Sequence, residues 1–565
     1  MAITKQYDII IVGAGPVGLF LASELALEAT TNNNNNDMSV LVLERDPLEP
    51  TAEKLAWTTA PLGVRGLNTA SAETLHRRGL LDLVFEHGVV EKLVMSVGEM
   101  QEKTKGRFVF GGHFAGMLLD ANKIDTNSAC FKYKLPGPAS MGGPTTLDRL
   151  TRVLRQRVEG IKGVELLGNV DIATVSEEDY HGDDSQGVVV GTSDGQEFHA
   201  RFVVGCDGGR SAIRKAAGFD FVGTDAELMG YSALCEFDDP QGRIKAGFWR
   251  TKGGIYVSGG QAGDKAGQTH FICMDADATA TATNCSFDRS KPPVTREHLE
   301  AVARRVVGHD DLGVKTIHQA SSWTDRSRQA TTYRRGRVLL AGDSAHIHSP
   351  LGAQGLNTGI GDAVNLGWKL GRVVRGHAPV GFLDTYTRER HPVGADVLEW
   401  SRAQVATLCP DPSSRALAGL VQDLVRTSDG TTCFVDRIWG LSQRYDMGDG
   451  GDGLDNQHPM VGFSAPDFEF VDDGTGRLGE LMRSGHGLLV DLGHDDIHGP
   501  ELSSLARDKA WFPQVDYVGA RAKDDLGIRA LLVRPDGVVA WAAGKNGVGL
   551  DEAKVALSRW FGTGN

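Results

Sequence analysis

The chain has 565 residues, more than a single hydrophobic core usually holds, so two or three domains are expected. Hydrophobic residues make up 41% of the sequence and charged residues 23%, as in ordinary soluble globular proteins. A net charge of −14 argues against nucleic acid or an anionic membrane as a partner, because both require clustered lysine and arginine.

The seven cysteines include no CxxC pair, and their odd number argues against a disulfide framework. The longest apolar run near the start, "DIIIVGAGPVGLFLASELAL", is broken by glycines and a proline and lacks a basic leader. We therefore expect neither a signal peptide nor a membrane span, and we expect the protein in the cytoplasm.

The first predicted elements are a buried strand over Tyr7–Val12, a glycine turn and a helix. In the turn, Gly13 permits the tight bend, Gly15 lets a pyrophosphate approach the backbone, and Gly18 lets helix and strand pack closely. The free N–H groups and dipole of the helix start favour phosphate. This GxGxxG context predicts a dinucleotide site, with a purely structural turn as the alternative. The motif residues are Gly13, Gly15, Pro16, Val17 and Gly18.

A second β-rich run, "SVLVLERD", ends in Glu44 and Arg45. The acid at a strand end is placed to accept hydrogen bonds from ribose hydroxyls. Between this strand and the first helix lies "TTNNNNND", residues 30–37, a polar low-complexity loop that we predict to be disordered.

The middle of the chain is predicted to be rich in strands. After a basic helix over Leu147–Val158, short antiparallel strands surround an "SDG" turn, and the last strand exits at Asp207. That acid could simply cap the helix that starts near Ser211. From about 220 to 325 the pattern alternates in the β manner. Trp249, Tyr256 and His270 fall on these strands and could line a substrate pocket, although aromatic residues on strands more often belong to a core.

The segment "LLAGDSAHIHSPLGAQGLNTG", residues 339–359, ends a third buried strand with an acid and a glycine-rich helix start. Asp343, after Gly342, can hold a sugar or ribityl chain, and Pro350 sets a rigid turn. Bare backbone N–H groups at the helix start suit the pyrimidine end of a reduced flavin, which carries negative charge. They come from Gly352, Gly355, Leu356 and Asn357. A second acid-terminated strand so far along the chain favours FAD over NAD.

His346 and His348 in the same segment could suggest a metal, but no HExxH motif or cysteine cluster supports one. We interpret them as packing or backbone-bonded residues and predict no metal site. The helical stretch "FLDTYTRERHPVGADVLEWSRA" follows, with one proline that marks a kink or break. The Gly- and Asp-rich "DGGDGLDNQHP" reads as a linker to a separate C-terminal unit.

Three segments, "VGAGPVGL", "CDGGRSAIRKAAG" and "GRVLLAGDSAHIHSPLGAQGLNTGIGDAVNLGWKL", resemble the signatures of single-component FAD-dependent aromatic hydroxylases. Relatives of para-hydroxybenzoate hydroxylase, phenol hydroxylase and the aromatic polyketide hydroxylases are the most similar. The resemblance covers roughly the first 400 residues. The C-terminal unit resembles the cysteine-poor thioredoxin-like domain of the phenol hydroxylase branch, and it has no cysteine for dithiol chemistry.

The resemblance implies roles for further residues. Asp207 and Gly208 belong to a motif associated with FAD and with transient NADH or NADPH binding. Arg65 and the "GLN" at 66–68 resemble the segment beside the flavin phosphates and ring. Ala353 stands where the family usually has glycine.

The implied activity is that of an FAD-dependent monooxygenase that consumes NAD(P)H and dioxygen. It would hydroxylate a phenolic or polycyclic aromatic substrate through a flavin hydroperoxide. Baeyer–Villiger insertion, epoxidation and a non-oxygenase flavin dehydrogenase stay open as alternatives, and a homodimer is one possible assembly.

The predicted fold class is α/β: a Rossmann-like FAD-binding domain interrupted by a β-rich substrate domain, plus a C-terminal thioredoxin-like domain. Residues 1–220 form the first part of the FAD-binding domain, with substrate-domain strands near 85–140, and residues 221–328 form the β-rich domain. Residues 329–400 return to the FAD-binding domain, 401–457 form a helical segment and linker, and 458–565 form the C-terminal domain. Because all three flavin motifs precede residue 455, we expect a chain truncated there to keep FAD binding.

Overall fold

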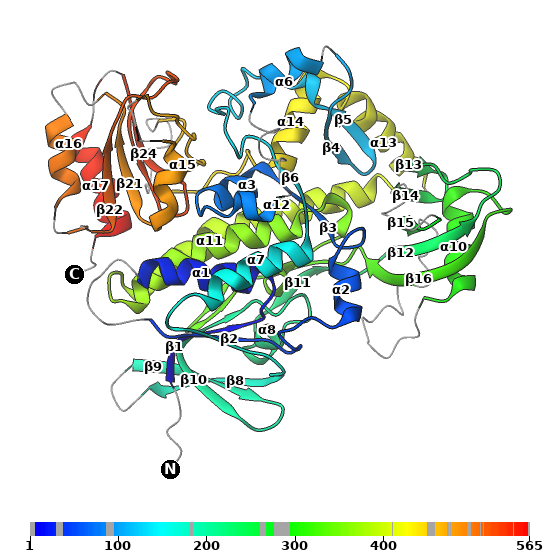
Figure 1. Cartoon of the computed structure of the whole chain (residues 1–565), viewed down its shortest axis with the longest axis horizontal. Helices are drawn as coiled ribbons and strands as arrows, with labels where there is room; N and C mark the ends of the chain where they lie inside the picture. Colours follow the sequence, from blue (N-terminus) through cyan, green and yellow to red (C-terminus); the bar gives the residue numbers. More distant parts are fainter. Residues whose placement is uncertain are drawn as a thin grey trace.

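The structure is a computed structural model of the chain (Figure 1). It describes residues 6–29, 38–85, 95–104, 106–180, 185–259, 267–275, 294–409, 411–448, 458–471, 474, 476–493, 499–508, 510–511, 513–545, 547 and 549–562. The polar loop 30–37 and most of the predicted linker, 449–457, lie outside the described residues. Among the described residues, no helix is both long and apolar enough to cross a lipid bilayer.

A central eight-stranded sheet carries the predicted nucleotide-binding motifs. Its main path runs β18-β19-β10-β1-β2-β7, and β9 and β8 extend it from β10. The neighbours β19, β10, β1, β2 and β7 are parallel, and Ile9, Ile10 and Ile11 of β1 are fully buried, as in a sheet covered on both faces. The strands are β1 (Gln6–Val12), β2 (Val40–Leu43), β7 (Val164–Leu167), β8 (Ile172–Tyr180), β9 (Ser185–Thr192), β10 (Glu197–Gly205), β18 (Arg334–Arg335) and β19 (Val338–Leu340).

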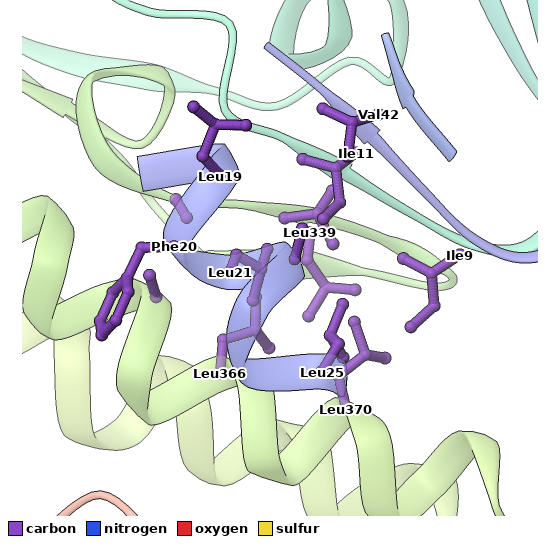
Figure 2. Packing of buried hydrophobic residues seen from close by; sticks show 14 of the residues in the cluster. Ile9, Ile11, Leu19, Phe20, Leu21, Leu25, Val42, Leu339, Leu366 and Leu370 are labelled. Carbon is purple, nitrogen blue, oxygen red and sulfur yellow. The ribbon is translucent and has the colours of Figure 1, made fainter. Parts of the chain in front are cut away.

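Two long helices pack on one another beside this sheet. Helix α1 (Pro16–Ala29) lies between the strands and α11 (Gly355–Val374), and it is apolar on nearly all sides because both of its faces are covered. Figure 2 shows Leu21 and Leu25 of α1 directed between Leu339 of β19 and Leu366 and Leu370 of α11. The other helices around the sheet are α2 (Ala52–Thr58), α3 (Thr69–His76), α4 (Leu81–Val84), α7 (Leu147–Glu159) and α8 (Ala212–Ala216).

The region from 221 to 328 is built on a five-stranded antiparallel sheet in the order β13-β14-β15-β12-β16. Helix α10 (Arg296–Val307) covers one face of it, whereas the sequence pattern predicted strands alone. The strands are β12 (Met229–Asp238), β13 (Gly247–Thr251), β14 (Gly254–Gly259), β15 (Thr269–Asp275) and β16 (Gly313–Thr324).

Small sheets join this region to the central sheet. Strand β3 (Val64–Leu67) pairs with β6 (Gly143–Thr146), and β4 (Phe110–Phe114) pairs with β5 (Met117–Asp120). A third sheet contains β11 (Phe221–Thr224), β17 (Ser327–Ala330) and β20 (His346–Ile347). Helix α6 (Val97–Thr104) and the short helix η1 (Ala121–Lys123) complete this part.

Beyond α11, the short helix η4 (Val380–Leu383) leads into α12 (Asp384–Ala406), which runs as one helix through Pro392. The proline therefore does not break the helix. Helices α13 (Pro412–Leu424) and α14 (Ser428–Trp439) follow it.

The C-terminal unit contains a four-stranded mixed sheet in the order β22-β21-β23-β24. Strands β21 and β22 are parallel, and the other pairs are antiparallel. Its hydrophobic core continues into the main body, because Trp368 of α11 packs against Trp560 and Phe561. The elements are α15 (Leu478–Leu481), η6 (Met482–Ser484), β21 (Gly487–Asp491), α16 (Gly499–Ala506), β22 (Val515–Gly519), β23 (Ile528–Val533), β24 (Val539–Gly544) and α17 (Leu550–Phe561).

Candidate cofactor site

Four parallel strands end side by side at one edge of the central sheet. Val12 of β1 pairs with Leu43 of β2 and with Gly205 of β10, and Gly205 pairs with Leu340 of β19. In a doubly wound sheet this carboxyl edge is where ligands bind. The segments that leave the four strands here contain the predicted Gly13–Gly18 turn, Glu44, Asp207 with Gly208, and Gly342 with Asp343.

The three glycines of the first turn have different surroundings. Gly13 has φ +111°, and a Cβ there would lie 2.4 Å from the carbonyl oxygen of Cys206. A Cβ on Gly18 would lie 1.9 Å from the carbonyl oxygen of Gly13. A Cβ on Gly15 would meet no atom within 4 Å. Gly13 and Gly18 are therefore required by backbone packing, whereas Gly15 faces open space that a pyrophosphate could enter.

Pro16 and Val17, next to this turn, begin helix α1. Pro16 is the first residue of α1, a position where the missing N–H of proline is no loss. Val17 is half-buried and packs near Gly342 and Gly359, so it joins the first motif to the third.

Glu44 is held against the glycine turn. Its carboxylate accepts hydrogen bonds from the backbone N–H of Ala14 at 2.8 Å and of Asp46 at 3.0 Å. The neighbouring Arg45 is exposed, with its Nε 3.9 Å from a carboxylate oxygen of Asp46. Glu44 therefore belongs to the sheet edge, whereas Arg45 lies at the surface beside it.

Asp207 does cap a helix, as the structural alternative proposed. Its Oδ2 accepts from the backbone N–H of Ala212 at 2.6 Å and of Ile213 at 3.2 Å. Its Oδ1 is buried and has no hydrogen-bond partner within the described part of the chain. Burial raises the pKa of this carboxyl group. Gly208 has φ +79° and open space where a Cβ would stand. Capping therefore uses one oxygen of Asp207 and leaves the other for a further donor.

The third motif combines a strained turn with an open helix start. Gly342 has φ +64°, and its N–H donates to Asp362 Oδ2 at 3.0 Å. The side chain of Asp343, the next residue, is exposed at the same sheet edge. Ala353 has φ +51°, in the left-handed region that favours glycine, which explains why the resemblance leads one to expect glycine here.

The start of α11 offers its unpaired backbone N–H groups. Gln354 precedes the helix without a side-chain cap, so among the described residues the N–H groups of Gly355, Leu356 and Asn357 have no such partner. The Asn357 side chain turns away instead, donating to the Gly66 carbonyl at 3.0 Å and accepting from Asn68 N–H at 2.9 Å. Pro350 and Gly352 are the first and last residues of the preceding short helix η3 (Pro350–Gly352). A Cβ on Gly352 would lie 2.8 Å from Gln404 Nε2.

The two histidines of this segment form hydrogen bonds, one with a carboxylate and the other with a backbone carbonyl. His346 Nε2 lies 2.8 Å from Asp362 Oδ2, and His348 Nδ1 lies 2.8 Å from the carbonyl oxygen of Ser349. The carbonyl can only accept, so Nδ1 of His348 is the protonated nitrogen. Its Nε2 is buried near Gly355 and, among the described residues, has no partner. No cluster of three or more metal-type ligands occurs in the described ranges.

The structure separates the three substrate-pocket candidates. Tyr256 pairs with Cys273 and stacks on Phe271 at 5.7 Å between ring centroids, in the core beneath α10. Trp249 pairs with Tyr256 and shares that face, because directly paired residues project to the same side. His270 projects to the opposite face. Trp249 and Tyr256 therefore lie on the opposite sheet face from His270, so the three candidates do not line one surface together. Strand alternation alone does not say which face is covered by a helix.

The sheet face that carries His270 packs toward η3, the short helix before α11. Met274 and Ile255 on this face share a hydrophobic cluster with Phe114 and with Leu351 of η3. Burial, followed by the charge of nearby Arg65, lowers the pKa of His270. Arg65 itself donates to the carbonyls of Leu62 and Val64, at 3.0 and 2.8 Å.

Asp362 is a residue of this site that the sequence did not reveal. It is fully buried on α11, and it holds the Gly342 N–H, His346 and Nε of Arg390, the last at 2.7 Å. The position of Asp362 in a helical pattern does not indicate a role at the site, because its partners come from α12 and from the turn after β19.

Comparison with known proteins places this geometry in a family. The FAD binding domain family matches residues 6–401, and the aromatic-ring hydroxylase C-terminal family matches residues 458–564. A monooxygenase of Claviceps purpurea is 45% identical over 99% of both chains. The 12-dehydrotetracycline 5-monooxygenase/anhydrotetracycline 6-monooxygenase of Streptomyces rimosus is 34% identical, again over 99% of both chains.

A solved structure, the anhydrotetracycline hydroxylase OxyS from Streptomyces rimosus, is similar with a TM-score of 0.76, at 32% identity over 99% of both chains. The resemblance inferred from the three motifs is thus confirmed. The chain belongs to the FAD-dependent aromatic-ring hydroxylases and is an FAD-dependent monooxygenase, with NAD(P)H as the co-substrate typical of the family.

Proposed function

We propose that FAD binds along the carboxyl edge of the central sheet, and that individual residues there contact its separate parts. Glu44 binds ribose hydroxyls, and the open space at Gly15 with the start of α1 takes the pyrophosphate. Asp343, together with Oδ1 of Asp207, binds the chain that leads to the flavin. The free N–H groups at Gly355–Asn357 face its pyrimidine end.

One observation carries this assignment. At neighbouring strand ends, Gly15 and Gly208 face open space, and an exposed carboxylate stands on Asp343, whereas Gly13 and Gly18 are tightly packed. The open positions are the ones that the cofactor contacts require. When bound, FAD supplies the redox chemistry: it takes a hydride from NAD(P)H and activates dioxygen for transfer of one oxygen atom.

We place the aromatic substrate between the His270 face of the middle sheet and the Pro350–Gly355 turn. Met274 and Leu351 belong to one cluster across this boundary, which brings the two surfaces together. Arg250 closes one side, donating to the carbonyls of Ala115 at 3.2 Å and Thr407 at 2.7 Å. The tasks of the protein here are to exclude water and to orient the ring.

A phenolic or polycyclic aromatic compound is the substrate class that fits. The support is similarity over the full chain to enzymes named for anhydrotetracycline, a name that denotes a four-ring compound. We further propose a thioredoxin-like C-terminal domain, supported by its mixed four-stranded sheet with helices, and a homodimeric, cytoplasmic enzyme.

Turnover with labelled dioxygen tests the function. We expect slow NAD(P)H oxidation by the protein alone and at least a tenfold rise with an accepted phenol, equivalent to about 1.4 kcal/mol in barrier. The product should gain one oxygen atom from dioxygen. A hydroxyl group distinguishes hydroxylation from Baeyer–Villiger insertion or epoxidation. An oxidised product without label would instead indicate a dehydrogenase.

A further inference from the structure

A buried seam of charged and polar residues runs along one face of α11. Asp362, Asn365 and Lys369 are spaced so that they share this face, and each is fully buried. They contact Glu389 and Arg390 of α12 and Asp536 of the C-terminal unit, and Arg534 joins them through Glu389 and Asp536. We call these seven residues the α11 seam. All of its side chains lie inside the protein, so solvent does not screen their charges.

The C-terminal end of the seam is a double ion pair. Nη1 and Nη2 of Arg534 donate to the two carboxylate oxygens of Glu389, at 2.9 and 2.8 Å, and the same guanidinium pairs with Asp536. Glu389 also accepts from Lys369 Nζ at 2.8 Å and Asn365 Nδ2 at 2.7 Å. Burial disfavours its charge, but Arg534 and Lys369 outweigh that effect and bring the pKa of Glu389 to about 2.

The other end of the seam is the turn at Gly342, after β19. Arg390, next to Glu389 on α12, donates to Asp362 at 2.7 Å and to the carbonyl of Thr358 at 2.9 Å. Asp362 in turn holds the N–H of Gly342. Tyr445 joins the two ends, because its ring lies 5.9 Å from the Arg390 guanidinium and 5.7 Å from that of Arg534.

We propose that the C-terminal unit positions the FAD site, with Arg534 as the positioning residue that acts through the α11 seam. Arg534 fixes Glu389, and thereby the part of α12 that presents Arg390 to Asp362 and the Gly342 turn. A buried ion pair adds little net stability because desolvation offsets its attraction, so we assign this network a geometric role. The inference rests on the proposed binding of FAD at the sheet edge.

The seam also changes the expectation for the truncated chain. A protein that ends near residue 455 lacks Arg534 and Asp536, so Glu389 loses its bidentate partner, Asn365 loses Asp536, and Trp368 loses the apolar cover of Trp560. All flavin motifs are still present in that chain, yet its FAD affinity should fall.

The test compares FAD affinity with the stability of the apoprotein in full-length variants. Arg534→Met keeps an apolar stem against Trp560 and removes the charge. We expect it to raise the FAD dissociation constant about tenfold and to alter the absorption spectrum of bound flavin. Lys545→Met removes an exposed ion pair with Asp525 from the same unit, and it should change neither quantity.

Trp560→Phe weakens the same interface while it keeps the Arg534 charge and an aromatic ring beside it, since the guanidinium lies 4.3 Å from the centroid of the Trp560 ring. At a comparable loss of melting temperature it should leave the dissociation constant within twofold, which separates positioning from general loosening. If Arg534→Met does not fold, Arg534→Met/Asp536→Asn removes one positive and one negative charge together and takes its place in the comparison.

A double-mutant cycle then tests the connection itself. Asp362→Asn and Arg534→Met act on one path, so their combined effect on FAD affinity should be smaller than the product of the single effects. Independent effects, or an unchanged dissociation constant for Arg534→Met, would overturn the inference. If Asp343→Ala weakens FAD while Arg534→Met does not, only the inference fails. If Asp343→Ala also has no effect, the proposed FAD site fails.

Discussion

Gly15 and Gly18 lie three residues apart at the start of α1 and face opposite surroundings. A side chain at Gly15 would enter open space, whereas one at Gly18 would lie 1.9 Å from the Gly13 carbonyl oxygen. The first glycine is therefore dispensable for folding and the second is not. The open position at Gly15 leaves the room that the proposed pyrophosphate site requires.

Replacing the two glycines should separate cofactor binding from folding. Gly15→Ala should leave the melting temperature of the apoprotein unchanged and raise the FAD dissociation constant at least about tenfold, or ~1.4 kcal/mol. Gly18→Ala should destabilise the apoprotein by about 1–3 kcal/mol, because a methyl group is forced against backbone. Fluorescence titration with FAD and thermal unfolding measure the two quantities. Wild-type affinity in Gly15→Ala would reduce the motif to a structural turn.

Two acids at the sheet edge should also behave differently. Asp343→Ala removes an exposed carboxylate, so the apoprotein should keep its stability while FAD affinity falls by about 1.5–3 kcal/mol, roughly one to two decades. Asp207→Ala should lower both, because Asp207 also caps α8, and a lost cap costs about 0.5–2 kcal/mol. Full flavin content and unchanged affinity in Asp343→Ala would contradict its assignment.

The motifs at the strand ends could be predicted from the sequence because each depends only on nearby residues. Glycines after an apolar run, an acid at a strand end and a helix start each depend on neighbours within a few residues, and the structure gathers them at one edge. Helix α10 was also within reach, since Thr295 caps its start and Gly308 ends it with φ +83°. The alternating apolar and polar pattern of the surrounding strands led us to predict strands over this whole region instead.

Tertiary contacts account for what the sequence did not reveal. Tyr256 and His270 have the same strand-like surroundings in the sequence. The pairing register of β14 with β15 puts them on opposite faces, and the position of α10 decides which face is covered. Asp362 looks like any polar residue of a helix until Arg390 and the Gly342 turn are brought to it. Long-range packing, rather than local pattern, fixes both.

The two faces of the middle sheet lead to a test of the substrate site. His270→Ala should raise KM for the aromatic substrate about fivefold, near 1 kcal/mol, with the FAD dissociation constant unchanged. Tyr256→Phe keeps the packing beneath α10 and should alter neither value. Steady-state kinetics at saturating NAD(P)H measure KM. An effect of Tyr256→Phe equal to that of His270→Ala would mean that the substrate does not distinguish the two faces.

His113 should make the folded protein sensitive to mild acid. Its ring lies 4.4 Å from the Phe248 ring, its Nδ1 accepts from the Gly116 N–H at 3.3 Å, and burial lowers its pKa from 6.5 to about 4. Between these values the unfolded chain binds the proton and the folded chain does not. Stability is therefore fully present above pH 6.5 and is lost as the pH falls toward 4.

At pH 5 the expected loss from this group is about 2 kcal/mol relative to pH 7. His113→Phe keeps an aromatic ring against Phe248 and cannot take up a proton, so its free energy of unfolding should fall less over the same interval. Urea unfolding of both proteins at the two pH values measures the difference. Glu389 titrates in both proteins, near pH 2, so it cancels in the comparison. Equal losses in wild type and His113→Phe would show that another group carries the acid sensitivity.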